Sequence, residues 1–185
     1  GLKLNKFLVK DFRKNITNKK EFYKVIKKVK PSIIFHLAAQ SSVLESYKKS
    51  EKTFFTNVVG TINVLESLRK VKSIKSAIIV TTDKVYLNQE RKKKFKESDH
   101  LGGYDIYSGS KASCEVLTNS YINSFFKNSN CKIATARSGN CIGGGDWTKD
   151  RIIKDCAEAF IFNKKLRRSP PKPKIVVRSA FNFWV

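Results

Sequence analysis

The chain has 185 residues, of which 41% are hydrophobic, and 38 Lys and Arg against 15 Asp and Glu give it a net charge of +23. This hydrophobic content excludes a disordered chain, and no apolar run approaches the roughly 20 residues that span a bilayer. Residues 1–6 hold no long apolar stretch, so we expect no signal peptide, a cytoplasmic location and no membrane partner.

The excess of positive charge raises the question of a nucleic-acid partner. The lysines are spread along the chain, and no helix-turn-helix, zinc-finger or RNP pattern organises them. We therefore expect no nucleic acid, although a basic nucleic-acid-binding protein stays an alternative. No C-x-x-C pair or His cluster is present, so we predict no metal site and four free thiols, at Cys114, Cys131, Cys141 and Cys156.

Apolar runs and helical periodicity alternate along the chain. Strands are expected at residues 6–11, 32–37, 77–80, 132–136 and 175–177. The run at 32–37 is continuous, which is typical of a strand buried on both faces. Helices are expected from a cap at Thr17 or Asn18 to Val29, and at residues 52–70, 105–126 and 150–162. Residues 38–42 and 84–103 are expected to be loops, and the prolines of 168–174 a turn. This alternation predicts βαβ units and a parallel sheet, which binds ligands at the carboxyl ends of its strands.

Two side chains on the helix predicted at 105–126 suit proton transfer. Tyr107 and Lys111 are four residues apart and therefore project from one helix face. A lysine ammonium beside a phenol favours the phenolate, which can accept a proton from a substrate hydroxyl. An isolated Tyr and Lys at this spacing is more often an ordinary surface pair, so the neighbouring motifs decide between these interpretations.

Five motifs occur in order along the chain. They are His36-Leu-Ala-Ala39, Asn57-Val-Val-Gly-Thr61, Thr82-Asp83-Lys84-Val-Tyr86, Tyr107-x-x-x-Lys111 and Arg137-x-x-Asn140. Their order resembles the extended short-chain dehydrogenase/reductase family, the NAD-dependent sugar-nucleotide epimerases and dehydratases. Asp83-Lys84 and the segment 139–151 resemble the CDP-glucose 4,6-dehydratase branch, since a glutamate is usual at the position of Lys84 in the dTDP-glucose branch. The family resemblance covers the chain to about residue 165.

The resemblance implies a catalytic role for five residues. Tyr107 would take the proton of the sugar 4-hydroxyl, Lys111 would keep Tyr107 deprotonated, and Thr82 would hydrogen-bond the same sugar oxygen. Lys84 would then remove the C5 proton as a neutral amine, and Asp83 would protonate the departing 6-hydroxyl. The implied activity is a carbon-oxygen lyase that converts CDP-glucose to CDP-4-keto-6-deoxyglucose and water, in lipopolysaccharide O-antigen biosynthesis. The alternatives are a sugar-nucleotide 4-epimerase or another dehydratase of the family. For Asp83 and Lys84, a plain surface ion pair is the other interpretation.

The resemblance also implies NAD as cofactor, a nucleotide-sugar substrate and a homodimeric or homotetrameric parent. NAD would contact Asp11, Leu37, Ala38, Ala39, Asn57, Tyr107 and Lys111, and the nucleotide diphosphate would contact Asn140 and Arg151. The two alanines could instead serve packing only, Asn57 could cap a helix start, and Arg151 could be a surface charge at a helix start.

The glycine fingerprint of the family, G-x-x-G-x-x-G after the first strand, is absent. Glycines at that position let the backbone approach the cofactor pyrophosphate. We therefore expect a fragment that is inactive alone. Its fold would be α/β, a partial Rossmann-like doubly wound parallel sheet without its first two strands, at residues 1–140. The beginning of a substrate-binding lobe would follow at 141–185.

Overall fold

The computed structural model describes residues 10–87, 94–148, 151–163 and 165. The chain divides into two compact units, and each is described by itself. The described part of the larger unit starts at Phe12 and ends at Gly139, and the smaller unit includes Asp11 and the described residues between 140 and 165. The domain boundary expected after residue 140 stays a prediction. The turn at 168–174, the strand at 175–177 and most of the strand at 6–11 lie outside the described residues.

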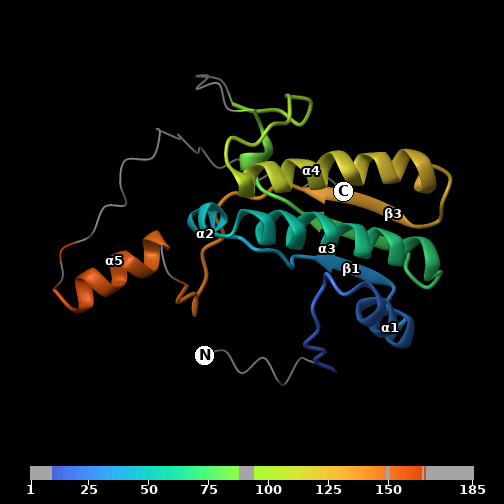
Figure 1. The fold of residues 1–185 in the computed structure, drawn as a ribbon, viewed down its shortest axis with the longest axis horizontal. Coiled ribbons are helices and arrows are strands. Elements are labelled where there is room, and N and C mark those ends of the chain that lie inside the picture. Colours follow the sequence, from blue (N-terminus) through green and yellow to red (C-terminus); the bar gives the residue numbers. More distant parts are fainter. Residues whose placement is uncertain (1–9, 88–93, 149–150, 164, 166–185) are drawn as a thin grey trace. The chain divides into compact units, whose positions relative to one another are not determined.

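The larger unit contains a parallel sheet in the order β1-β2-β3 (Figure 1). Its strands are β1 (Ile33–His36), β2 (Ser76–Val80) and β3 (Lys132–Ala136). Ile33 pairs with Ser76, and Ser76 pairs with Lys132. All three strands lie within about a residue of the positions predicted from their apolar runs, and the parallel arrangement is confirmed.

The helices of this unit are α1 (Lys19–Val29), α2 (Val43–Lys48), α3 (Ser50–Lys70) and α4 (Ile106–Tyr121). Asn18 is the N-cap of α1 and accepts a hydrogen bond from the backbone N–H of Glu21 at 3.2 Å, as expected of a short polar side chain there. Helices α3 and α4 pack side by side (Figure 1). The smaller unit contains α5 (Ile152–Ile161).

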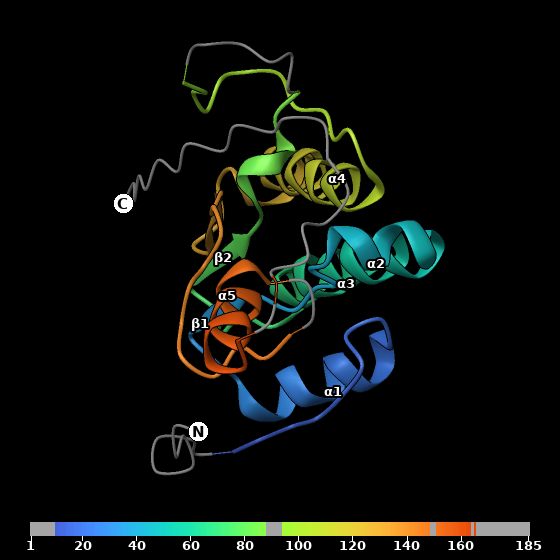
Figure 2. The same ribbon diagram turned by 90° about the vertical axis from the view of Figure 1, so that its left-hand side faces the viewer.

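The core of the larger unit lies between the sheet and its helices. It consists of Leu65, Leu68, Val71, Ile74, Ala77, Phe126 and Cys131. Tyr23 and Ile26 of α1 and Ile34 of β1 pack against it. Because each buried Leu or Phe contributes about 1.5–3 kcal/mol, this cluster holds α1, α3 and α4 on the sheet. Figure 2 shows α1 and α3 on the same side of β1.

The expectation that residues 32–37 are buried on both faces is wrong. Ile34 faces the core, whereas Ile33 and Phe35, on the other face of β1, are 53% and 62% exposed. Both faces of a strand are buried only when helices cover both faces of its sheet. In the described part of this unit, the helices that form the core pack on one face.

Three local features differ from the sequence prediction. The short helix α2 was not expected, and α3 begins two residues earlier than predicted. The segment 84–103 was expected to be loop, but it contains the 3-10 turn η2 (Asp83–Val85) and an antiparallel bridge between Tyr86 and Leu101. Helix α4 continues as a π-helical turn, η3 (Ile122–Phe126), where a plain α-helix was predicted.

Candidate active site at the carboxyl edge of the sheet

Tyr107 and Lys111 lie on the buried face of α4. Both side chains are less than one-tenth exposed, so the alternative of a surface pair does not hold. The helix begins at an N-cap, Asp105, whose carboxylate accepts hydrogen bonds from the backbone N–H and the hydroxyl of Ser108 at 3.0 and 2.8 Å. This cap fixes the first turn, and with it the position of Tyr107, since a helix N-terminus leaves N–H groups that need partners.

The ammonium of Lys111 reaches the end of β2. Its Nζ donates a hydrogen bond to the backbone carbonyl of Val80 at 3.1 Å. Burial lowers the pKa of Lys111 from its ordinary value, and the thiol of Cys114 and the carboxylate of Glu115 act in the opposite direction. The Lys111 ammonium therefore lies at the carboxyl edge of the sheet. Its partner Val80 is the last residue of β2 and precedes Thr82 by two residues.

The Thr82-Asp83-Lys84 segment forms a tight turn against α4. Helix α4 packs on η2, and the backbone N–H of Asp83 donates to the carbonyl of Ser138 at 3.0 Å. Thr82 is buried, and its hydroxyl donates to Asp83 Oδ1 at 3.1 Å. Lys84 Nζ lies 3.7 Å from the same oxygen, and both charged side chains are about three-quarters buried. Asp83 and Lys84 do form an ion pair, but not a plain surface one.

Asn57 lies in the middle of α3, so it is not a helix cap. It is buried, and its amide makes three hydrogen bonds within the protein. Oδ1 accepts from the backbone N–H of Gln40 at 2.8 Å, and Nδ2 donates to the Gln40 carbonyl at 3.1 Å and to Ser110 Oγ at 2.8 Å. Ser110 Oγ in turn donates to the carbonyl of Tyr107 at 2.7 Å. Asn57 thus ties the loop after β1 to the helix that carries Tyr107.

His36 ends β1 beneath this network. Its ring is buried, and Nε2 lies in hydrogen-bond contact with Thr61 Oγ1 at 3.1 Å. Burial, and then the charge of Lys111, lowers the pKa of His36 from 6.5 to about 4. The imidazole is therefore neutral in the folded protein at neutral pH, so it does not repel the ammonium of Lys111.

We expect His36 to make the folded protein acid-sensitive. The unfolded chain binds a proton near pH 6.5 and the folded chain only near pH 4, so stability is lost as pH falls between these values. Over that window the free energy of unfolding should drop by about 3 kcal/mol more than in a His36→Gln variant. Urea denaturation at a series of pH values measures this difference. Equal pH slopes for the two proteins would contradict the assignment.

Several residues of this site carried no role in the sequence prediction. Glu115 is buried, and its carboxylate accepts hydrogen bonds from Thr135 Oγ1 at 2.9 Å and Arg137 Nη2 at 3.1 Å. One signal could have found Glu115, because it continues the four-residue spacing of Tyr107 and Lys111 on the same helix face. Gln40 gave no comparable signal, since its backbone contacts depend on how α3 packs.

The residues expected to meet a cofactor at the end of β1 lie open. Leu37 and Ala38 are exposed and Ala39 is half-buried. The other expected ligand residues, Asp11, Asn140 and Arg151, belong to the smaller unit, so their roles stay predictions. Arg151 is the N-cap residue of α5 and forms an ion pair with Asp146 at 3.7 Å, which agrees with a charge at a helix start.

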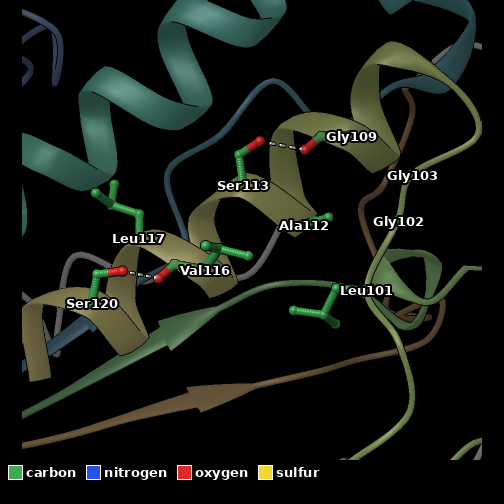
Figure 3. A pocket seen from close by; sticks show the side chains of 9 residues that line it. All are labelled: Leu101, Gly102, Gly103, Gly109, Ala112, Ser113, Val116, Leu117 and Ser120. Carbon is green, nitrogen blue, oxygen red and sulfur yellow. Dashed lines mark hydrogen bonds between the residues drawn. The ribbon is translucent and has the colours of Figure 1, made fainter. Parts of the chain in front are cut away.

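A groove of about 530 Å³ lies beside α4 (Figure 3). Its helical lining residues, spaced around Gly109, Val116 and Ser120, lie on the face of α4 opposite to Tyr107 and Lys111. Its lining consists of Leu101, Gly102 and Gly103 of the preceding loop and Gly109, Ala112, Ser113, Val116, Leu117 and Ser120 of the helix. The groove is therefore separate from the candidate site.

All four cysteines are described and are free thiols, as predicted. In the ranges that the structure describes, no helix is both long and apolar enough to cross a membrane.

Comparison with known proteins identifies a family and relatives of this chain. A sequence model of the family described as GDP-mannose 4,6 dehydratase matches residues 5–142. The chain is 40% identical to CDP-glucose 4,6-dehydratase of Salmonella typhimurium over 163 residues, which cover 85% of this chain and 44% of that protein. It is 30% identical to dTDP-D-glucose 4,6-dehydratase of Dictyostelium discoideum, covering 89% of this chain and 39% of that one. The chain thus spans less than half the length of these relatives.

Solved structures agree with this assignment. dTDP-glucose 4,6-dehydratase of Bacillus anthracis, solved in complex with NAD, superposes with a TM-score of 0.67 at 27% identity, covering 83% of this chain and 45% of that one. UDP-glucose 4-epimerase of Thermotoga maritima shares the fold at a TM-score of 0.73 and 21% identity, covering 83% and 49%. The family model covers well over half of the chain, and the fold is that of a Rossmann-like α/β protein. The chain belongs to the extended short-chain dehydrogenase/reductase family of sugar-nucleotide epimerases and dehydratases.

Proposed function

We propose that the complete protein containing this chain is an NAD-dependent sugar-nucleotide 4,6-dehydratase, which converts CDP-glucose to CDP-4-keto-6-deoxyglucose and water. The observation that carries this proposal is the packing of the Thr82–Lys84 turn against α4, which bears Tyr107 and Lys111. This arrangement joins a phenol and lysine suited to oxidation at C4 with an acid and a base suited to elimination. The identity to a CDP-glucose 4,6-dehydratase supports the same substrate.

The residues at the carboxyl edge of the sheet fit NAD, the cofactor of this family. The small, open side chains at Ala38 and Ala39 leave the backbone after β1 accessible. Lys111 offers ammonium protons beyond the one that it donates to Val80, so it could also bond a ribose hydroxyl. When bound, NAD would accept a hydride from C4 of the sugar and return it to C6. For Asn57 we propose a positioning role, because its amide is already engaged with Gln40 and Ser110.

In the first step, Tyr107 accepts the proton of the sugar 4-hydroxyl while C4 becomes a ketone. The buried ammonium of Lys111 favours the phenolate form that this transfer needs. The hydroxyl of Thr82, which can both donate and accept, bonds the same sugar oxygen. The new ketone acidifies the proton on C5, which prepares the elimination.

In the second step, the Lys84 ammonium first passes a proton to the Asp83 carboxylate, which gives a neutral amine and a carboxylic acid. Lys84 then removes the C5 proton, and Asp83 protonates the 6-hydroxyl, which leaves as water. The 3.7 Å separation of Lys84 Nζ and Asp83 Oδ1 supports this proposal, because a single elimination needs its base and its acid close together. The protonated Lys84 can then return its proton to C5, and bound NADH would supply the hydride for C6, so NAD would not be consumed.

We expect a Lys84→Gln variant of the complete gene product to stop after the first step. Loss of a general base lowers the rate by about 10²–10⁴-fold, whereas Tyr107 and Lys111 still carry out oxidation at C4. Product is measured as loss of one water by mass spectrometry, and the arrested step as a build-up of reduced-cofactor absorbance. Lys72→Gln, at an exposed lysine before the amino end of β2, is the matched control.

Three outcomes separate the candidates for this activity. Formation of a 4-keto-6-deoxy product from CDP-glucose supports the proposal, and preference for another nucleotide sugar keeps the reaction but changes the substrate. An unchanged hexose mass with inverted C4, insensitive to Lys84→Gln, would assign an epimerase instead. For the assembly we propose a homodimer or homotetramer, supported by the exposed apolar side chains of α3 and α4 at Phe54, Phe55 and Val116.

A further inference from the structure

Glu115 has a buried carboxylate to which the proposed mechanism assigns no role. It is 4% exposed and lies one helical turn after Lys111 on the same face of α4. A buried carboxylate is costly unless its oxygens are bonded or paired with a cation. Glu115 meets this requirement fully, since it accepts hydrogen bonds from Thr81 Oγ1, Thr135 Oγ1 and Arg137 Nη2.

These three partners come from the ends of two strands. Thr81 directly follows β2 and precedes the catalytic Thr82, whereas Thr135 belongs to β3 and Arg137 directly follows it. One carboxylate on α4 therefore holds the carboxyl ends of both strands to the helix that carries Tyr107 and Lys111. A helix displaced along its axis would lose all three contacts together.

The cation that Glu115 binds also supports the far side of the catalytic turn. The Arg137 guanidinium lies over the ring of Tyr86, 4.9 Å from its centroid, and Nη1 donates to the carbonyl of Glu97 at 3.0 Å. Tyr86 in turn stacks on Phe95, with ring centroids 4.7 Å apart. The Glu115–Arg137 pair thus contacts the chain before Thr82 through Thr81 and after Lys84 through Tyr86.

Glu115 also contributes charge to its neighbour on the helix. Its carboxylate raises the pKa of Lys111 against the larger, lowering effect of burial. Two other titratable groups interact with Lys111, His36 of β1 and Cys114 of α4. Tyr107 shares its helix face, Asp83 and Lys84 lie on η2, which packs against α4, and Arg137 is paired with Glu115. His36 is neutral at pH 7, and burial raises the pKa of the Cys114 thiol. Near neutral pH, Glu115 is therefore the negative charge on α4 that favours the Lys111 ammonium.

We propose that Glu115 is a positioning residue of this site, which holds α4 to the ends of β2 and β3 and keeps Lys111 charged beside Tyr107. The inference rests on the proposed function, because it assigns Glu115 a part in preparing the Tyr107–Lys111 pair. It differs from a purely structural role in one measurable respect. Removing a negative charge lowers the pKa of nearby groups and removing a positive charge raises it, whereas a lost contact that leaves charge and burial unchanged has neither effect.

The test compares Glu115→Gln and Arg137→Gln in the complete gene product with NAD bound. Removal of the anion disfavours the protonated forms of Lys111 and Tyr107, so both limbs of the pH–rate profile should move to lower pH by about one unit. Removal of the cation at Arg137 should move both limbs to higher pH. The Lys111 titration, followed by NMR with labelled lysine and assigned with Lys111→Arg, should shift in the same directions and needs no turnover.

Thr135→Val is the matched control, because it removes one hydrogen bond to Glu115 and leaves every charge in place. It should lower the thermal midpoint and leave the Lys111 titration where it is. An unmoved Lys111 titration in both charge variants would overturn the proposal. If Glu115→Gln does not fold, the direction of the Arg137→Gln shift decides. Failure of the wild-type protein to convert any nucleotide sugar would instead reject the proposed function, while the titration still tests Glu115.

Discussion

Replacing Tyr107 by phenylalanine is expected to lower turnover of the complete gene product by about a thousandfold, within the range for loss of a general acid–base group. The ring stays, so the buried position on α4 remains filled and the fold should persist. The lost oxygen is the one that we propose accepts the proton of the sugar 4-hydroxyl. Because oxidation at C4 comes first, no reduced cofactor should build up, in contrast to Lys84→Gln. Single-turnover absorbance distinguishes the two variants.

Tyr121→Phe provides the control for this substitution. It is the same change on the same helix, at the end away from the site. It removes a hydrogen bond of 3.1 Å that the Tyr121 hydroxyl donates to Glu66 Oε1. That loss should cost about 1 kcal/mol of stability and leave turnover near the wild-type value. A Tyr107→Phe enzyme with turnover within tenfold of wild type would remove Tyr107 from the mechanism.

Gly103→Ala is expected to destabilise the larger unit by about 3 kcal/mol, at the upper end of the usual cost of overpacking. A Cβ atom at Gly103 would lie 1.9 Å from the backbone nitrogen of Gly109 and 2.2 Å from the carbonyl carbon of Ser108. Both atoms belong to the first turns of α4 and cannot yield without moving the helix. The loop 101–103 would have to leave the helix, disturbing the Asp105 cap and the position of Tyr107. Urea denaturation measures the loss.

Gly109→Ala tests this reasoning with the same change six residues away. A Cβ at Gly109 would meet no atom within 4 Å, and alanine in a helix is favoured over glycine by about 1 kcal/mol. This variant should therefore be slightly more stable than the wild type. If both variants had the same stability, close contact at Gly103 would not be the reason for a glycine there.

The regular elements could be predicted because local patterns determine them. The apolar runs at β1, β2 and β3 and the cap at Asn18 each act over a few residues. The exposure of Phe35 could not be predicted, since it depends on what covers the second face of the sheet. The short helix α2 and the π-turn at Ile122–Phe126 were missed because neither leaves a periodic pattern of sufficient length.

The site was predictable where its residues follow one another in sequence. Tyr107 and Lys111 share a helix face at a fixed spacing, and Thr82 to Lys84 directly follow a strand. Glu115 was missed because an acidic residue in a helix is usually solvent-exposed. The contacts of Asn57 with Gln40 and Ser110 join segments up to 53 residues apart, and only the packing of α3 on α4 brings them together.

Small polar side chains fill much of the α3–α4 interface, among them Asn57, Thr61, Ser110 and Thr118. Among the described residues, the hydroxyl of Thr118 is the one buried side-chain group without a hydrogen-bond partner. An apolar interface would tolerate a helix that slides by one turn, about 5.4 Å, because the contact of one methyl group can be replaced by that of another. Hydrogen bonds between particular atoms do not allow such an exchange. The axial register of α4 is therefore encoded in the polar contacts that it makes with α3.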